Sequence, residues 1–306
     1  MQSIRTLLAA SDLSAFARHA AERAAMVASE VGARLSIAHV VNGSGLNALR
    51  HLVDVGTGDV AARLLDEVRG EVRELVDDIG QRYGARVDMH LATGAVMSEL
   101  SQYAEVIDAD LLVLGARGSS VVREWLLGTT TERMLSKSSR AMLVVKQMPH
   151  ENYQRVLVPV DFSPRSADAL RFARSVAPKA DLILLHAFEV PFEGKLRYAG
   201  VESDALAALR VTAKREAVEK MNALVDAAGL GDAGVRRIVL HGDAAATILA
   251  QEQEQDCDLI VIGKRGLGLL EELLLGSVTK HILAQSNGDV MVTDREFLTS
   301  VTDFSN

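Results

Sequence analysis

The chain is poor in cysteine and has no long apolar run, and each shortage excludes a class of protein. One cysteine in 306 residues excludes a disulfide framework and a structural zinc site built from cysteines, and it fits a reducing compartment. No apolar run approaches the ~18–20 residues that span a bilayer. The apolar run at residues 7–10 is interrupted by Asp12 and is too short for a signal peptide. We therefore expect a cytoplasmic protein without membrane insertion.

Positive charge is also scarce. The 33 Lys and Arg residues are outnumbered by 41 Asp and Glu residues, and the formal net charge is -8. Because nucleic-acid binding needs a clustered cationic face, this balance argues against a general nucleic-acid partner. The length of 306 residues, of which 48% are hydrophobic, suggests about two domains, each large enough to bury its own core.

The two halves of the chain repeat one another. Three segments of the first half reappear with offsets of 149, 147 and 148 residues: 6–14 as 155–163, 36–40 as 183–187, and 110–115 as 258–263. Solenoid repeats run only ~20–50 residues, so a period this long indicates two fused copies of one domain. We predict domains at residues 1–147 and 153–294, joined near Pro149, and a polar tail at residues 295–306.

Strand and helix patterns alternate along each copy. In the first copy we expect strands at 7–10, 35–41, 87–91, 111–114 and 142–145, and helices at 15–31, 60–81, 97–107 and 130–138. The second copy follows the same pattern, with its long helix at 205–228. Continuous Val, Ile and Leu runs are typical of strands covered on both faces, as in parallel sheets. The sequence therefore predicts two α/β domains, each a five-stranded, doubly wound parallel sheet with helices on both faces.

A glycine pattern follows the fourth strand of each copy. Both copies contain Gly-x2-Gly-x9-Gly-[Ser/Thr], formed by Gly115, Gly118, Gly128 and Thr129 in the first copy and by Gly263, Gly266, Gly276 and Ser277 in the second. Glycines after a buried strand let a ligand approach the backbone, and successive amides there can bind an anion. The last two residues of each pattern precede a helix, whose first amides and dipole favour phosphate. The pattern predicts a phosphate site in at least one copy.

These motifs resemble the universal stress protein family over nearly the whole chain, in the form of two fused domains of the ATP-binding type. The second copy is more similar to the family, since the first has Ala10 in place of the usual Pro and Thr129-Thr130 in place of Ser-Val. The resemblance implies Rossmann-like domains of the adenine nucleotide alpha hydrolase kind. It implies that adenosine is held by the first-strand aspartate and by the backbone after the second-strand histidine, at Asp12, Val40, Asp161 and Ala187. It also implies that the two glycine patterns hold the phosphates.

The expected ligand is ATP, with or without Mg²⁺, and AMP and ADP are alternatives. We expect a stress-response regulatory protein with little or slow ATP hydrolysis, because no nucleophile and base stand together in the sequence. A small-molecule or lipid carrier, or a scaffold for partner proteins, is the alternative. An adenylate-transferring enzyme is disfavoured, since its His-Ile-Gly-His-like or Ser-Gly-Gly-x-Asp-Ser-like signature is absent. In this family fifth strands commonly pair edge to edge, so residues 142–145 and 290–292 are expected to form a pseudo-dimer within one chain; a homodimer of whole chains stays open.

Several single residues have weaker signals. His39 and His186 end equivalent strands, which favours a packed or hydrogen-bonded role over ligand contact. Cys257 lies between two aspartates, so its thiol pKa is expected to be raised and the thiol inert. The charged residues of the glycine loops could reach phosphate or stay solvated, and the sequence leaves both open; they are Arg117, Lys264 and Arg265.

Overall fold

The structure is a computed structural model that describes residues 4–43, 58–118, 127–231, 234–264 and 275–294. It divides into two compact units, one spanning Ser3–Asn152 and one that begins at Tyr153. We call them the N-terminal and the C-terminal unit and describe each by itself.

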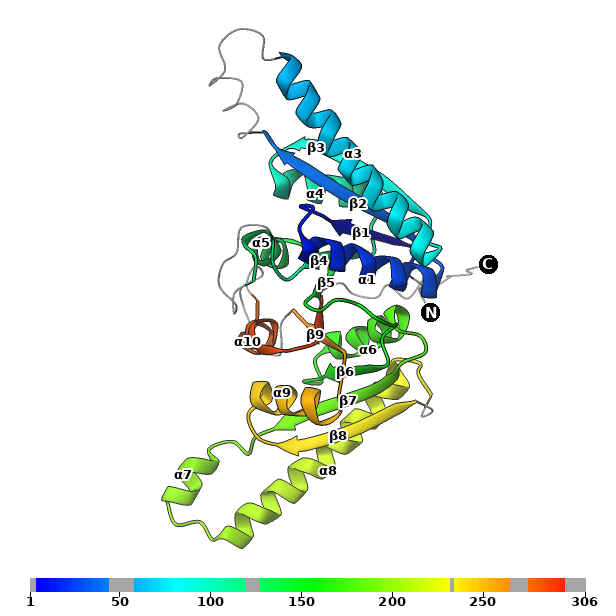
Figure 1. The fold of residues 1–306 in the computed structure, drawn as a ribbon. Helices are drawn as coiled ribbons and strands as arrows, with labels where there is room; N and C mark the ends of the chain where they lie inside the picture. Colours follow the sequence, from blue (N-terminus) through cyan, green and yellow to red (C-terminus); the bar gives the residue numbers. More distant parts are fainter. Residues whose placement is uncertain (1–3, 44–57, 119–126, 232–233, 265–274, 295–306) are drawn as a thin grey trace, which may run out of the picture. The chain divides into compact units, whose positions relative to one another are not determined.

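The N-terminal unit is a parallel sheet covered by helices on both faces (Figure 1). Its strands are β1 (Thr6–Ala10), β2 (Arg34–Asn42), β3 (Val87–Gly94), β4 (Leu111–Gly115) and β5 (Ala141–Val145). They lie in the order β3-β2-β1-β4-β5, and every pair is parallel. The helices are α1 (Ala15–Val31) and α3 (Gly58–Tyr83) on one face, and α4 (Val96–Val106) and α5 (Thr129–Lys137) on the other.

The C-terminal unit repeats this architecture. Its strands are β6 (Arg155–Pro159), β7 (Asp181–Phe188), β8 (Val235–His241), β9 (Leu259–Gly263) and β10 (Asp289–Thr293). Their order, β8-β7-β6-β9-β10, matches that of the first unit and is parallel throughout. The helices are α6 (Pro164–Val176), α7 (Glu193–Tyr198), α8 (Ser203–Ala227), α9 (Ala244–Glu254) and α10 (Ser277–Gln285). The predicted fold of two similar, doubly wound α/β domains is confirmed.

The strands and the first helix form for reasons that the sequence shows. β1 and β4 are buried along almost their whole length, as continuous apolar runs between two helical layers must be. α1 is capped at its start by Ser14, whose hydroxyl accepts from the Ala17 amide, and at its end by Gly32, whose φ is 72°. Such a left-handed C-cap favours glycine because it has no Cβ.

The repeated aspartate before the fourth strand has a structural role in both units. Asp110 Oδ2 accepts hydrogen bonds from the backbone amides of Arg5 and Thr6, at 2.8 and 3.1 Å. Asp258 accepts from the amides of Gln154 and Arg155, at 2.6 and 3.2 Å. The carboxylate therefore satisfies the free amides at the start of the first strand and fixes the fourth strand beside it. Within the described residues, no helix combines the length and the apolarity needed to cross a membrane.

Candidate functional site

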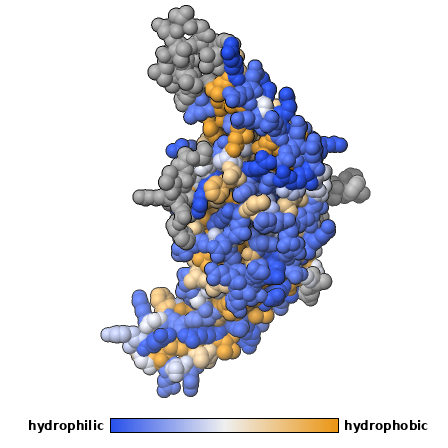
Figure 2. Space-filling model, viewed as in Figure 1, coloured by the Kyte–Doolittle hydropathy of each residue, from blue (hydrophilic) through white to orange (hydrophobic). Residues whose placement is uncertain are grey.

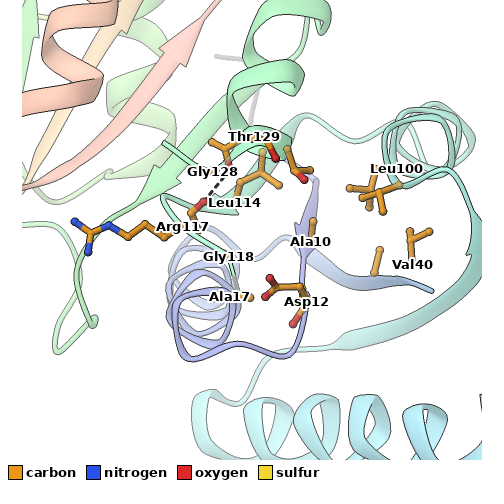
Figure 3. A pocket seen from close by; sticks show the side chains of 16 residues that line it. Ala10, Asp12, Ala17, Val40, Leu100, Leu114, Arg117, Gly118, Gly128 and Thr129 are labelled. Carbon is orange, nitrogen blue, oxygen red and sulfur yellow. Dashed lines mark hydrogen bonds between the residues drawn. The ribbon is translucent and has the colours of Figure 1, made fainter. Parts of the chain in front are cut away.

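A pocket of about 160 Å³ opens in the N-terminal unit where β1, β2 and β4 end (Figure 3). In a doubly wound sheet, ligands bind at this edge, where the strand order reverses. The structure brings all six predicted site residues of the first copy to its lining. They are Asp12, Val40, Gly115, Gly118, Gly128 and Thr129.

One wall of the pocket is apolar. Val40 on β2 faces Leu100 on α4 in Figure 3, and Val96 lies one turn before Leu100 on the same helix. Sequence reasoning missed both α4 residues, because an apolar pair at this spacing is equally typical of a helix that only packs on the core. The opposite side carries Asp12. The pocket therefore has an apolar side that suits a flat ring and a polar side with hydrogen-bonding groups.

The first glycine of the loop is packed against backbone and the second against a carboxylate. A Cβ on Gly115 would lie 3.0 Å from the backbone oxygens of Phe16 and Arg117, so β4 could not pass α1 as it does. A Cβ on Gly118 would lie 2.7 Å from Asp12 Oδ2. Gly118 therefore lets the loop backbone approach the Asp12 carboxylate at the rim of the pocket.

The third glycine has a different environment. Among the described residues, a Cβ on Gly128 would lie 3.6 Å or more from every other group, and its nearest neighbours would be the Gly118 nitrogen and the Ala116 oxygen. The described part of the chain thus leaves room for a methyl group at this position. That methyl group would contact the Gly118 nitrogen and the Ala116 oxygen, close to the start of α5.

The amides of the two glycines that precede α5 and α10 bind carbonyl oxygens of their own loops. Gly128 N donates to Ala116 O at 2.8 Å, and Gly276 N donates to Lys264 O at 3.0 Å. These bonds close the loop onto the helix. The first turn of α5 has no side-chain cap, since Gly128 is the N-cap, so its orphan amides begin at Thr129. Thr131 Oγ1 donates to Gly115 O at 2.9 Å and ties α5 to the end of β4.

The turn between β1 and α1 holds the Asp12 side chain in place. Asp12 Oδ1 accepts from the Ser14 amide at 3.1 Å, and Leu13 has φ of 65°. A positive φ is costly for a leucine and persists only where the surroundings impose it. His39 Nδ1 lies 2.9 Å from Ser11 O, which is the hydrogen-bonded role that the sequence favoured. The imidazole thereby binds the residue next to Asp12.

Two of the three charged loop residues contact other groups of the chain. The Arg117 guanidinium lies over the Phe16 ring, 5.5 Å from its centroid, and Figure 3 shows it directed away from the pocket. Lys264 is only 3% exposed, and its Nζ is 3.4 Å from Asp294 Oδ2. Arg165 pairs with the other Asp294 oxygen at 3.2 Å. Arg265, the third loop cation, lies outside the described residues.

The C-terminal unit builds the same turn after its first strand. Asp161 Oδ1 accepts from the Ser163 amide and from Ser166 Oγ, both at 3.0 Å. Phe162 has φ of 62°, as Leu13 has in the first unit. His186 Nδ1 lies 2.8 Å from Val160 O. The two turns differ in one hydrogen bond to the aspartate. Ser166 donates to Asp161, whereas the corresponding residue of α1 is Ala17, which has no side-chain donor.

The other predicted residues of the second copy lie at the same sheet edge. Ala187 is the seventh residue of β7, Gly263 ends β9, and Ser277 begins α10. Thr279 Oγ1 donates to Gly263 O at 2.9 Å, which repeats the contact between α5 and β4. Gly266 lies outside the described residues.

The thiol of the one cysteine has a raised pKa, as its acidic neighbours predicted. Cys257 is buried, and its thiol pKa is raised to about 12 by burial and then by the Asp258 and Glu252 carboxylates. The neutral thiol is a poor nucleophile and a poor metal ligand. In the parts of the chain that the structure describes, no group of three or more His, Cys, Asp or Glu side chains is placed to hold a metal ion.

Comparison with known proteins identifies the family. The model of the universal stress protein family matches residues 3–146 and again 152–294. The chain belongs to the universal stress protein family. A universal stress protein of Mycolicibacterium smegmatis is 27% identical over 228 residues, which cover 71% of this chain and 72% of the relative. One of Methanocaldococcus jannaschii is 28% identical over 159 residues, covering 47% of this chain and 96% of the relative.

A solved structure shares the tandem fold. The crystal structure of a universal stress protein from Archaeoglobus fulgidus aligns with a TM-score of 0.65 at 22% identity, and the alignment covers 95% of this chain and 98% of that chain. Two universal stress protein domains in one chain are thus supported both by the repeated family match and by this likeness in fold.

Proposed function

We propose that this universal stress protein is a stress-response regulator that binds an adenine nucleotide, with ATP as the first candidate, and turns it over slowly or not at all. The observation that carries the proposal is the pocket of the N-terminal unit, at the sheet edge where the strand order reverses. Six residues chosen from sequence alone line it. The C-terminal unit, with the same strand ends and the same turn at Asp161, is proposed as a second site.

The binding mode follows from the two sides of the pocket. The adenine ring lies against Val40 and Leu100. Burial of its apolar surface there contributes the non-directional part of the binding free energy. The Asp12 carboxylate, fixed by Ser14, accepts from the ribose hydroxyls. The phosphates lie at the start of α5, where uncapped amides and the Thr129 hydroxyl donate. Three or four charge-assisted bonds of ~1.5–3 kcal/mol each, with the buried ring, approach the ~8 kcal/mol of a micromolar ligand.

Slow turnover is proposed from the chemistry of the lining. Among the described residues that line the pocket, Asp12 is the one carboxylate, and none is a histidine, a cysteine or a lysine. His39 uses Nδ1 on the backbone of Ser11. This lining binds and orients a nucleotide without placing a nucleophile beside a base, which is what a sensor requires. Cytoplasmic location and pairing of the two fifth strands within one chain stay predictions.

Thermal unfolding of the full chain with and without nucleotide tests the proposal. A ligand at 100 times its Kd adds about 2.7 kcal/mol to the stability of the unit that binds it, which for a unit of this size raises Tm by roughly 5–10 °C. We expect this shift with ATP, ADP or AMP and a smaller one with GTP, whose base has different edge groups. No shift with any adenine nucleotide would favour the carrier or scaffold. Pyrophosphate release with an acceptor substrate would favour the adenylate-transferring enzyme.

A further inference from the structure

A buried serine hydroxyl binds the aspartate that is proposed to contact the nucleotide in the C-terminal unit. Most of the surface seen in Figure 2 is hydrophilic, because polar side chains usually stay in water. Ser166, the third residue of α6, is instead only 5% exposed. Its Oγ donates to Asp161 Oδ1 at 3.0 Å. Since the acceptor is a carboxylate, this is a stronger hydrogen bond than one between two neutral groups.

The backbone of the turn that carries this aspartate is held by other contacts. His186 Nδ1 lies 2.8 Å from a backbone oxygen of the turn, and the His186 ring packs on Phe162 with the two centroids 4.3 Å apart. The Ser163 amide donates to Asp161 Oδ1 at 3.0 Å. None of these contacts involves the Ser166 hydroxyl. Removal of this hydroxyl would therefore leave the turn in place and act on the carboxylate.

The hydroxyl restricts the rotation of the carboxylate. The torsion that turns the carboxyl group of an aspartate is soft, and each hydrogen bond to the group narrows it. A carboxylate has about four acceptor positions, and the amide and the hydroxyl both use Oδ1 of Asp161. In the N-terminal unit the corresponding second oxygen, Asp12 Oδ2, lies 2.7 Å from where a Cβ on Gly118 would be, at the rim of the pocket. By the repeat, the hydroxyl directs Asp161 Oδ2 toward the ligand side of the C-terminal unit.

The N-terminal unit shows that the fold does not need a hydroxyl at this position. The third residue of α1 is Ala17, which lines the pocket and has no side-chain donor. α1 nevertheless forms, with its N-cap bond from the Ala17 amide to Ser14. Ser166→Ala therefore introduces a residue that the same place in the same fold already carries. Any effect on ligand binding can be separated from an effect on folding.

We propose that Ser166 is a positioning residue that makes the C-terminal unit selective for nucleotides with intact ribose hydroxyls. It holds Asp161 in the orientation that accepts from the ribose, so this side chain does not have to be ordered when the ligand binds. A dideoxynucleotide, which lacks both ribose hydroxyls, offers the carboxylate no donor and does not benefit from the ordering. The inference rests on the proposed function, because it requires that Asp161 faces a bound nucleotide.

Isothermal titration of the full chain with ATP and with dideoxy-ATP tests the proposal. The parent protein and its variants all carry Gly128→Val, so that the N-terminal unit contributes no nucleotide site. We expect Ser166→Ala to raise the Kd of ATP roughly 2- to 10-fold, as the ordering of one side chain predicts. The Kd of dideoxy-ATP should stay unchanged. A serine with a purely structural role would change both Kd values by the same factor.

A second serine of the same helix provides the matched control. Ser175 lies on α6, and its hydroxyl donates to Phe172 O at 2.8 Å, so Ser175→Ala should leave both Kd values unchanged. Thermal unfolding shows whether each variant is folded. If Ser166→Ala does not fold, Ser166→Cys replaces the hydroxyl by a weak donor, and the two nucleotides are compared on that variant.

The outcomes distinguish the inference from the proposed function. An unchanged Kd of ATP in folded Ser166→Ala, or an equal rise for both nucleotides, would overturn the inference and leave the proposed function standing. A Gly128→Val protein that does not bind ATP, although the wild type does, would also overturn the inference, because the C-terminal unit would then hold no nucleotide. Absence of ATP binding in both proteins would overturn the proposed function, and the inference with it.

Discussion

Replacing Gly128 by alanine separates the role of the glycine loop in binding from its role in folding. A Cβ at this position meets no described group of the chain closer than 3.6 Å, so α5 can form with a methyl group there. The methyl group would lie between the Gly118 nitrogen and the Ala116 oxygen. In our account a phosphate occupies this space. Gly128→Ala should therefore weaken nucleotide binding more than it weakens the fold.

The size of each effect follows from the contacts. Alanine is a poorer N-cap than glycine, which costs about 1 kcal/mol of stability. Moving a phosphate off one charge-assisted hydrogen bond costs ~1.5–3 kcal/mol, or roughly 10- to 100-fold in Kd. Gly115→Ala should behave in the opposite way. Its Cβ would lie 3.0 Å from two backbone oxygens, and overpacking of this kind costs about 1–3 kcal/mol of stability.

Isothermal titration with ATP and urea unfolding measure the two quantities. Both experiments use proteins that also carry Gly276→Val, so that the C-terminal unit contributes no nucleotide site. Gly70→Ala is the matched control, because a Cβ on Gly70 of α3 meets nothing within 4 Å. It should leave the Kd unchanged and stabilise the helix slightly. The reasoning is refuted if folded Gly128→Ala binds ATP with the Kd of the background protein.

Three further predictions concern titratable groups. Cys257, with its pKa raised to about 12, should resist a thiol reagent at pH 8 in the native protein and react only after unfolding; rapid native labelling would contradict its burial. Hydrogen bonds from Arg210, and then from His241, lower the pKa of Glu193 from 4.5 to about 2. The carboxylate thus contributes stability that is complete above about pH 4.5 and is lost as the pH falls through about 2, and Glu193→Gln should remove this part of the acid dependence in urea unfolding. Burial lowers the pKa of His90 below 6.5, and its ring stacks on Tyr103 at 3.5 Å. Stability should therefore fall as the pH drops below 6.5, and His90→Phe should flatten that slope; an unchanged slope would assign it to another group.

The elements and the site edge could be predicted because both depend on local patterns. Buried runs such as Leu111–Gly115 mark strands of a parallel sheet, and the carboxyl ends of such strands meet at one edge. The glycine spacing assigned Gly118 and Gly128 to one predicted site, and the repeat placed Asp161 in the same turn as Asp12. These inferences depend on the order of the strands in the sheet. Short connections between consecutive elements leave few possible orders, so the strand ends that meet can be inferred.

What sequence reasoning missed depends on contacts between distant side chains. The burial of Lys264 against Asp294 and the stacking of Arg117 on Phe16 have no local signal. Helix α7 was not predicted, because its position is held by ion pairs of Glu193 with residues of α8 and β8. These contacts join residues that are distant in the sequence and form only when the chain folds. The sequence alone therefore does not show whether a charged side chain contacts solvent, an aromatic ring or an opposite charge.

The most direct test of the central claim is a crystal structure of the full chain grown with a non-hydrolysable ATP analogue. The account predicts the adenine ring against Val40 and Leu100 and the phosphates within hydrogen-bond distance of the first-turn amides of α5. An empty pocket in the N-terminal unit at saturating nucleotide, or a nucleotide bound away from the ends of β1 and β4, would contradict it.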